Sequence, residues 1–271
     1  MGSVFSPYYA WAGRGDPLNH CAVNVALYGA SGHRWAMTER GRRAVRREAD
    51  TLVVGPSSAR WEGDALVIRL AEVTCPWPSR LRGTVRLHPL LPTRHVEVLD
   101  APGRHRWWPL APLARVEVNL ERPALRWSGH GYLDANAGEE PLEAGFVEWD
   151  WGRAAVGDEA VVHYDVHRRD EARHRLALRF RTDGRVEPLE PPPQAELRRT
   201  LWRVRRRVPC EAGHRPRVEQ TLEDTPFYAR SLVDTRLLGR PVRCMHESLL
   251  LDRFSAGWVR TLLPFRMPRR G

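Results

Sequence analysis

The chain has 271 residues, of which 42% are hydrophobic, so it can form one large or two small domains with a real core. Its net charge is +10, and all 43 basic residues are arginine. These arginines are scattered in short runs instead of being gathered beside stacking aromatic residues, which argues against a nucleic-acid-binding protein.

Short alternating segments follow one another along the chain. Apolar and polar residues alternate with a period of two, which predicts strands. The predicted strands are 21–27, 64–70, 84–87, 115–120, 146–151, 161–167, 176–181, 247–251 and 258–263. Asp183-Gly184 predicts a hairpin turn, and segment 195–204 is the best helix candidate, although it could equally be a strand. With 22 prolines and 21 glycines as punctuation, the pattern predicts an all-β antiparallel protein.

Two segments could mark domain boundaries. The proline-rich segment 188–193 could be a linker or a rigid surface loop. Segment 107–112 is too apolar for a free linker, and we interpret it as a buried crossover between two β domains, 1–110 and 111–271. Ligands often bind at such junctions, so a ligand site is expected there.

The sequence predicts a cytoplasmic protein. Its start lacks the charged and apolar regions of a signal peptide, and no apolar run reaches the length of a membrane-spanning helix. The four cysteines show no metal-binding or disulfide spacing, so they are expected to be reduced thiols. The diffuse positive charge would suit attraction to anionic lipid headgroups.

One predicted strand carries an unusual row of polar side chains. In the segment S-G-H-G-Y-L-D-A-N, alternation places His130, Tyr132 and Asp134 on the same face. Upstream, His105 and Trp107 also share a face. If the two faces meet in an apolar pocket, Asp134 becomes a candidate proton donor surrounded by aromatic rings.

Several uncommon blocks, in a fixed order, resemble those of the carotenoid 1,2-hydratases, also called hydroxyneurosporene synthases. The early blocks are FSPYYAW at 5–11, DPLNHC at 16–21, NVALYG at 24–29 and RWAMTER at 34–40. The later blocks are GYLDAN at 131–136, EWDWG at 148–152, EDTPFYAR at 223–230 and LPFRMPR at 263–269. The similarity covers nearly the whole chain.

The resemblance implies two calycin-like (lipocalin-like) β domains and hydration of an acyclic carotenoid of the neurosporene or lycopene type, without a cofactor. The family's functional pairs, His-x-Trp and Tyr-x-Asp, fall on His105, Trp107, Tyr132 and Asp134. The implied partners are the carotenoid, water and membrane lipid, with no nucleic acid. A carotenoid is insoluble in water, so peripheral association with the inner or photosynthetic membrane of a bacterium is expected.

Hydration of an unactivated alkene requires a strong acid that still carries its proton. Burial among aromatic rings raises the pKa of a carboxyl group, which makes Asp134 the expected acid. His105 could hydrogen-bond this carboxyl and return its proton, Trp107 could stabilise the carbocation through its π face, and Tyr132 could position the acid or the water.

Other residues and other functions stay open. His130 could replace His105 as the partner of the acid, and three indoles are second-tier candidates for substrate contact, namely Trp108, Trp149 and Trp151. The set His163, Asp165 and His167 has ligand chemistry for a metal, but we expect it to face solvent and predict no metal site. A lipocalin-like carrier without chemistry, or a hydratase or cyclase for another terpenoid or polyketide, are the alternative functions.

Overall fold

The computed structural model describes residues 3–29, 32–170 and 172–271. Strands predominate within these residues and the helices are short, which confirms the predicted all-β fold class. No helix in the described ranges has both the length and the apolar character that crossing a bilayer requires.

The chain divides into two compact units that are each discontinuous in sequence. Unit 1 comprises Met1–Pro89, Ala114–Tyr132 and Arg260–Gly271, and unit 2 comprises Leu90–Leu113 and Leu133–Val259. This division cuts across the single boundary at residue 110 that the sequence suggests. The reason is the length of β9 (His105–Arg122) and β10 (Ala124–Gly138), because each of these strands contributes one part to each unit.

Unit 1 contains two sheets that share an apolar core. β1 and β2 pair in antiparallel fashion and β20 joins β2 in parallel, while the larger sheet has the order β10-β9-β7-β6-β5-β4-β3. The core consists of Ala36, Leu70, Leu81, Val116, Val118 and Leu120. The elements are α1 Pro7–Trp11, β1 Cys21–Leu27, β2 Arg34–Arg40, β3 Val45–Arg47, β4 Thr51–Val54, β5 Ser57–Glu62, β6 Ala65–Val73, β7 Arg80–Leu91 and β20 Arg269–Arg270.

A buried carboxylate connects both ends of unit 1 to β2. Glu39 has no exposed surface, and its oxygens accept hydrogen bonds from Ser6 and Arg269. His20 Nδ1 lies 2.8 Å from Glu39 Oε1. A buried charge is tolerated only when several donors satisfy it, so this cluster fixes the first helix and the last strand in place.

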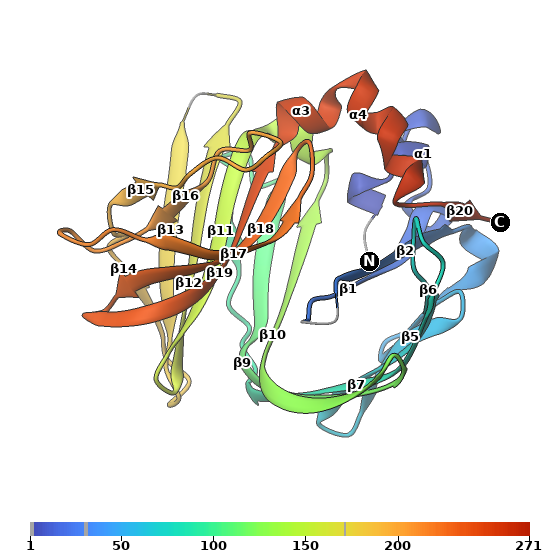
Figure 1. Cartoon of the computed structure of the whole chain (residues 1–271), viewed down its shortest axis with the longest axis horizontal. Coiled ribbons are helices and arrows are strands. Elements are labelled where there is room, and N and C mark those ends of the chain that lie inside the picture. The colour runs from blue at the N-terminus through green and yellow to red at the C-terminus, as the bar shows by residue number, and fades with distance from the viewer. Residues whose placement is uncertain (1–2, 30–31, 171) are drawn as a thin grey trace. The chain divides into compact units, whose positions relative to one another are not determined.

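Unit 2 is built on a seven-stranded antiparallel sheet with the order β14-β13-β12-β11-β19-β18-β17 (Figure 1). A two-stranded sheet, β15-β16, accompanies it, and β8 pairs with the first part of β9. The strands are β8 Glu97–Val98, β11 Phe146–Val156, β12 Glu159–Arg168, β13 Arg173–Phe180, β14 Val186–Leu189, β15 Gln194–Glu196, β16 Arg207–Pro209, β17 Arg217–Asp224, β18 Tyr228–Leu237 and β19 Arg240–Leu250. The helices are α2 Leu142–Gly145, α3 Leu251–Ser255 and α4 Gly257–Leu262, the last of which begins in unit 2 and ends in unit 1.

Most predicted strands are confirmed, but two local predictions are wrong. Segment 258–263 belongs mainly to helix α4, because a short apolar run does not distinguish strand from helix by periodicity alone. Segment 195–204 is not a helix: β15 ends at Glu196, and Thr200 Oγ1 accepts from Val204 N at 3.1 Å to close a turn. Segment 107–112 lies inside β9, where Trp107 pairs with Glu97 of β8, and the same strand continues from unit 2 into unit 1.

The hairpin at Asp183-Gly184 forms between β13 and β14 as predicted, with Gly184 at φ 91°. The proline-rich segment 188–193 stays within unit 2, where it connects β14 to β15. It is therefore a loop of one unit and not a linker between two.

Candidate active site

A cluster of aromatic rings in unit 2 forms the wall of the candidate site. Alternation along the paired strands β11 and β12 places Trp149, Trp151 and Tyr164 on one face, with Trp151 opposite Tyr164. The Tyr164 ring centroid lies 4.9 Å from that of Trp107 and 6.2 Å from that of Trp149. Trp107 is fully buried, whereas Trp149 and Trp151 are half-buried. The exposed edges of these two indoles can therefore meet a ligand.

Asp134 lies against this cluster. The indole Nε1 of Trp107 donates a hydrogen bond of 2.9 Å to Asp134 Oδ2, and the Asp134 side chain is half-buried. Two residues further along β10, Asn136 Oδ1 accepts from the Tyr164 hydroxyl at 3.2 Å. Both polar side chains of β10 are thus held by aromatic donors, which fixes the position of the carboxyl group.

Tyr164 is a neutral phenol under any ordinary condition. Burial raises its pKa well above the usual value of 10.0, and the nearby Asp134 and Glu247 carboxylates raise it further. The hydroxyl therefore keeps its hydrogen and acts as a donor, and the ring adds apolar surface to the site.

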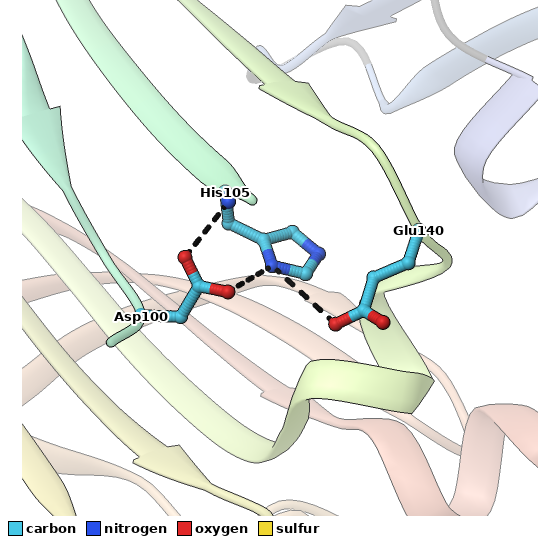
Figure 2. Close-up of side chains that lie close together, drawn as sticks. All are labelled: Asp100, His105 and Glu140. Carbon is cyan, nitrogen blue, oxygen red and sulfur yellow. Dashed lines mark hydrogen bonds and ion pairs between the residues drawn. The ribbon is translucent and has the colours of Figure 1, made fainter. Parts of the chain in front are cut away.

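His105 lies beside two carboxyl groups, those of Asp100 and Glu140 (Figure 2). Its backbone N–H donates to Asp100 Oδ1 at 2.8 Å, and its ring Nδ1 lies 3.2 Å from Asp100 Oδ2 and 4.0 Å from Glu140 Oε1. The ring is 2% exposed and contacts Phe146 edge-to-face, with a centroid distance of 4.6 Å. Since Nδ1 faces Asp100, the proton of a neutral imidazole is expected on Nδ1 and the lone pair on Nε2.

Two glycines leave room for this imidazole. A Cβ added at Gly138 would lie 2.9 Å from His105 Cδ2, and one added at Gly145 would lie 2.8 Å from His105 Cε1. Real Cβ atoms do not approach so closely, so the ring occupies space that any other residue at either position would fill. The orientation of His105 therefore depends on both glycines as well as on Asp100.

Asp100, His105 and Glu140 are also a possible metal-ligand group, with donor atoms all within 4.8 Å of one another. Nitrogen and carboxylate oxygen donors of this kind suit zinc or iron. However, Asp100 already accepts from both the backbone and the ring of His105. A histidine oriented by a carboxylate accounts for these contacts, so we assign no metal to them.

The structure brings together some of the residues that the sequence selected and differs on others. Trp107 contacts Asp134 as a hydrogen-bond donor. The hydrogen bond expected between His105 and Asp134 is not formed among the described residues, because His105 Nδ1 pairs with Asp100 and Nε2 has no hydrogen-bond partner there. Tyr132 is half-buried and His130 is exposed, and both belong to the part of β10 in unit 1.

Four residues of the site were not selected from the sequence. Asn136 follows the GYLDA segment on β10, Tyr164 lies on β12, and Asp100 and Glu140 come from loops next to strand ends. Alternation within β12 signals Tyr164, since it shares a face with Val162 and Val166. Nothing in the local sequence signals Asp100, because its role follows from a turn that brings it back to His105. Trp108, another second-tier candidate, is half-buried.

The opposite face of β11 and β12 is polar and buried, contrary to expectation. His163 and Asp165 were predicted to face solvent, yet they are only 3% and 4% exposed. Asp165 accepts from Arg173 Nη1 at 3.1 Å and from Gln194 Nε2 at 3.1 Å, so residues of β13 and β15 cover this face. The prediction failed because β12 is an inner strand that is covered on both sides.

Comparison with known proteins gives a consistent result. The family description "Carotenoid hydratase CrtC" matches residues 1–271. Over 275 residues the chain is 57% identical to a protein of Thiocapsa roseopersicina named acyclic carotenoid 1,2-hydratase, covering 100% of this chain and 68% of that protein. A protein of the same name from Cereibacter sphaeroides is 45% identical over 271 residues, covering 100% of this chain and 96% of the other.

The solved structures agree on the fold. A crystal structure described as a putative AttH from Nitrosomonas europaea superimposes with a TM-score of 0.56 at 15% identity, covering 84% of this chain and 79% of that one. Fold and matches together define an all-β, lipocalin-like enzyme of the hydro-lyase class. Within that class, the chain belongs to the carotenoid hydratase family CrtC.

Proposed function

We propose that this enzyme adds water to the terminal 1,2 double bond of an acyclic carotenoid and forms a tertiary alcohol. The observation that supports this most directly is the hydrogen bond from Trp107 to Asp134 inside a cluster of aromatic rings. Family membership adds the substrate class, since the relatives are named acyclic carotenoid 1,2-hydratases.

The reaction begins with protonation of the alkene. Asp134 gives its proton to the less substituted carbon, C2, and the π electrons of the double bond form the new C–H bond. The positive charge then lies on the tertiary carbon C1. Water adds to C1 and loses a proton, so that one water molecule is consumed in total. The hydrogen bond from the Trp107 indole to Asp134 Oδ2 holds in place the carboxyl group that would deliver the proton.

The aromatic residues divide two tasks between them. Trp107 is fully buried and donates to the acid, so we assign it the orientation of Asp134. Trp149 is half-buried next to Tyr164, and its π face is suited to stabilise the carbocation, an effect of about 2 kcal/mol when water is excluded. Tyr132 keeps the role of positioning the acid or the water.

His105 is the proposed base that removes the last proton. With Nδ1 directed at Asp100, its Nε2 carries the lone pair that can accept a proton from the attacking water and pass it back to the acid. We prefer His105 to His130 because His105 is buried and oriented by a carboxylate, whereas His130 is exposed. Asp100 is a positioning residue in this scheme.

An isotope experiment tests the proposal. The purified protein is incubated with lycopene or neurosporene in deuterium oxide or in heavy-oxygen water, without added cofactor. We expect a more polar product that carries one deuterium at C2 and the heavy oxygen at C1. Unaltered pigment that stays tightly bound would instead identify a carrier, and turnover of only another terpenoid or a polyketide would identify a different hydratase or cyclase.

The substrate also sets where the enzyme works. An acyclic carotenoid resides in a lipid bilayer, so we propose peripheral association with a bacterial membrane, assisted by the net charge of +10. Release of the protein from membranes by high salt supports this association, and fractionation that does not change with salt contradicts the electrostatic contribution.

A further inference from the structure

An exposed apolar turn in unit 2 has no role in the site described above. The turn joins β15 to β16 and closes through a hydrogen bond of 2.9 Å from Arg203 N to Thr200 O. Leu201 at its tip is 97% exposed, and Trp202 beside it is 47% exposed. A leucine that is almost completely surrounded by water makes no packing contribution to the unit, so its presence at a turn tip calls for an external partner.

A second indole extends this apolar tip. Trp258 of α4 is 53% exposed and stacks on Trp202, with ring centroids 6.3 Å apart and an interplanar angle of 27°. Together Leu201, Trp202 and Trp258 form one apolar surface, which we call the Leu201 tip. Tryptophan is the residue type that prefers the boundary between lipid headgroups and acyl chains.

The backbone of the tip is held rigidly. Arg253 of α3 donates to the Trp202 carbonyl at 2.6 Å and to the Pro226 carbonyl at 3.2 Å. Asp224 Oδ2 accepts from Trp202 N at 3.2 Å. These bonds use backbone groups and leave the side chains of Leu201 and Trp202 facing outward, so the tip is presented in a fixed conformation.

Exposed arginines flank the tip along the chain. Four arginines in the segment 198–205 are exposed, and this segment contains no acidic residue: Arg198, Arg199, Arg203 and Arg205. An apolar tip flanked by exposed arginines complements an anionic bilayer, in which the apolar side chains enter the interface and the guanidinium groups remain among the phosphates.

We propose that the Leu201 tip is the surface through which this enzyme docks on anionic lipid bilayers. The choice of a bilayer as the partner rests on the proposed function, because a carotenoid substrate has to be taken from lipid. Charge complementarity favours the bilayer over a second copy of this chain, which would bring two clusters of exposed arginines together.

Vesicle binding tests the surface. The full chain is mixed with vesicles of phosphatidylcholine alone or with anionic phosphatidylglycerol added, and bound protein is measured by flotation. We expect binding to the anionic vesicles, loss of this binding at high salt, and a blue shift of tryptophan fluorescence. Leu201→Asp should weaken partitioning by roughly tenfold or more.

Leu90→Asp is the matched control, because Leu90 is an exposed leucine of the same unit, at 67%, outside the tip. It makes the same chemical change and should leave vesicle binding intact. Replacing Arg198, Arg199, Arg203 and Arg205 with glutamine should abolish the preference for anionic lipid, and unchanged circular dichroism would show that each variant folds. Equal losses for Leu201→Asp and Leu90→Asp, or equal binding to neutral and anionic vesicles, would overturn the assignment, as would concentration-dependent dimerisation that Leu201→Asp abolishes.

Activity assays separate this proposal from the proposed function. With carotenoid embedded in anionic vesicles, Leu201→Asp should hydrate more slowly than the wild type, whereas with detergent-dispersed carotenoid the two should be equal. Hydration by a wild-type protein that does not bind vesicles overturns the docking surface and leaves the function standing. Vesicle binding through the tip without any hydration supports the docking surface and contradicts the proposed function.

Discussion

The two faces of strands β11 and β12 differ in how they hold a carboxylic acid. On the aromatic face, the rings of Trp149 and Tyr164 accompany Asp134, whose Oδ2 accepts from a neutral indole N–H. On the other face, Asp150 accepts a hydrogen bond from the Ser248 hydroxyl. The Arg207 Nε lies 3.5 Å from Asp150 Oδ2. Asp134 thus accepts a hydrogen bond from a neutral indole, whereas Asp150 lies beside a cation.

The comparison shows that a shifted pKa alone does not identify a catalytic acid. Burial raises the pKa of Asp150 to about 7, although Ser248 and Arg207 act in the opposite direction. Such a value is typical of catalytic groups. Yet Asp150 is only 7% exposed, and its neighbours Glu148 and Asp165 are paired with arginines in one network. We therefore interpret Asp150 as part of a structural network and Asp134 as the acid.

Replacing each of the two acids by its amide tests this interpretation. We expect Asp134→Asn to lower kcat/KM for carotenoid hydration by roughly 10²–10⁴-fold, the range that loss of a general acid produces. Asp150→Asn should keep activity near the wild-type level, because the amide can still accept from Ser248. Product formation measured by chromatography of the extracted pigments distinguishes them, and near-normal hydration by Asp134→Asn would exclude it as the proton donor.

The fold was largely predictable because its strands follow the alternation rule. The predicted strand 21–27 coincides with β1, and 161–167 lies within β12. Alternation within β11 also accounts for Asp150 lying on the face opposite Trp149. What alternation could not tell is which faces are covered, and for this reason the buried His163 was expected in solvent.

The site was predictable only in part, because side chains from distant segments complete it. The sequence selects Trp107 and Asp134 both by their strand faces and by family resemblance, and a hydrogen bond joins them. Asp100 reaches His105 through a turn, and Tyr164 reaches Trp107 from another strand of unit 2. Tertiary contacts of this kind have no periodic signal in a single sequence.

A substitution of Asp100 tests whether this carboxylate orients the proposed base, His105. We expect Asp100→Asn to lower kcat by roughly tenfold to 100-fold, the effect typical of losing a carboxylate that orients a functional histidine, with a smaller change in KM. Asp100→Glu, which keeps a carboxylate near the imidazole, should recover part of the lost kcat. A purely structural role would alter stability without this difference in kcat between the two variants.

Gly145 tests whether the imidazole needs its present position. In Gly145→Ala the added methyl would meet His105 Cε1 at 2.8 Å and displace the ring. A shift of about 1 Å costs up to 10²-fold in rate, so a smaller movement should lower kcat by about tenfold. Gly129→Ala in β10 is the control, since its methyl would first meet a Trp127 ring carbon at 3.4 Å, an ordinary contact. Equal rates for the two variants would mean that His105 is not required where it lies.

The smallest expected effect on activity comes from His163, which lies on the polar face of β12 and affects stability instead. Burial lowers the pKa of His163 from 6.5 to about 3, and Arg175 and His246 lower it further. The folded state therefore binds fewer protons than the unfolded state between these values, so the contribution of His163 to stability rises with pH from about 3 to 6.5 and is constant above.

His163→Gln removes this contribution. Urea unfolding at pH 4 and pH 7 should show that the wild type gains more stability between the two than the variant does, by roughly 3 kcal/mol. Both proteins keep His246 and Asp150, so the difference between them isolates His163. Hydration activity at pH 7 should be the same in both, because His163 lies on the face of β12 opposite Tyr164. A variant that loses activity while keeping its stability would place chemistry on the polar face and contradict the division between the two faces.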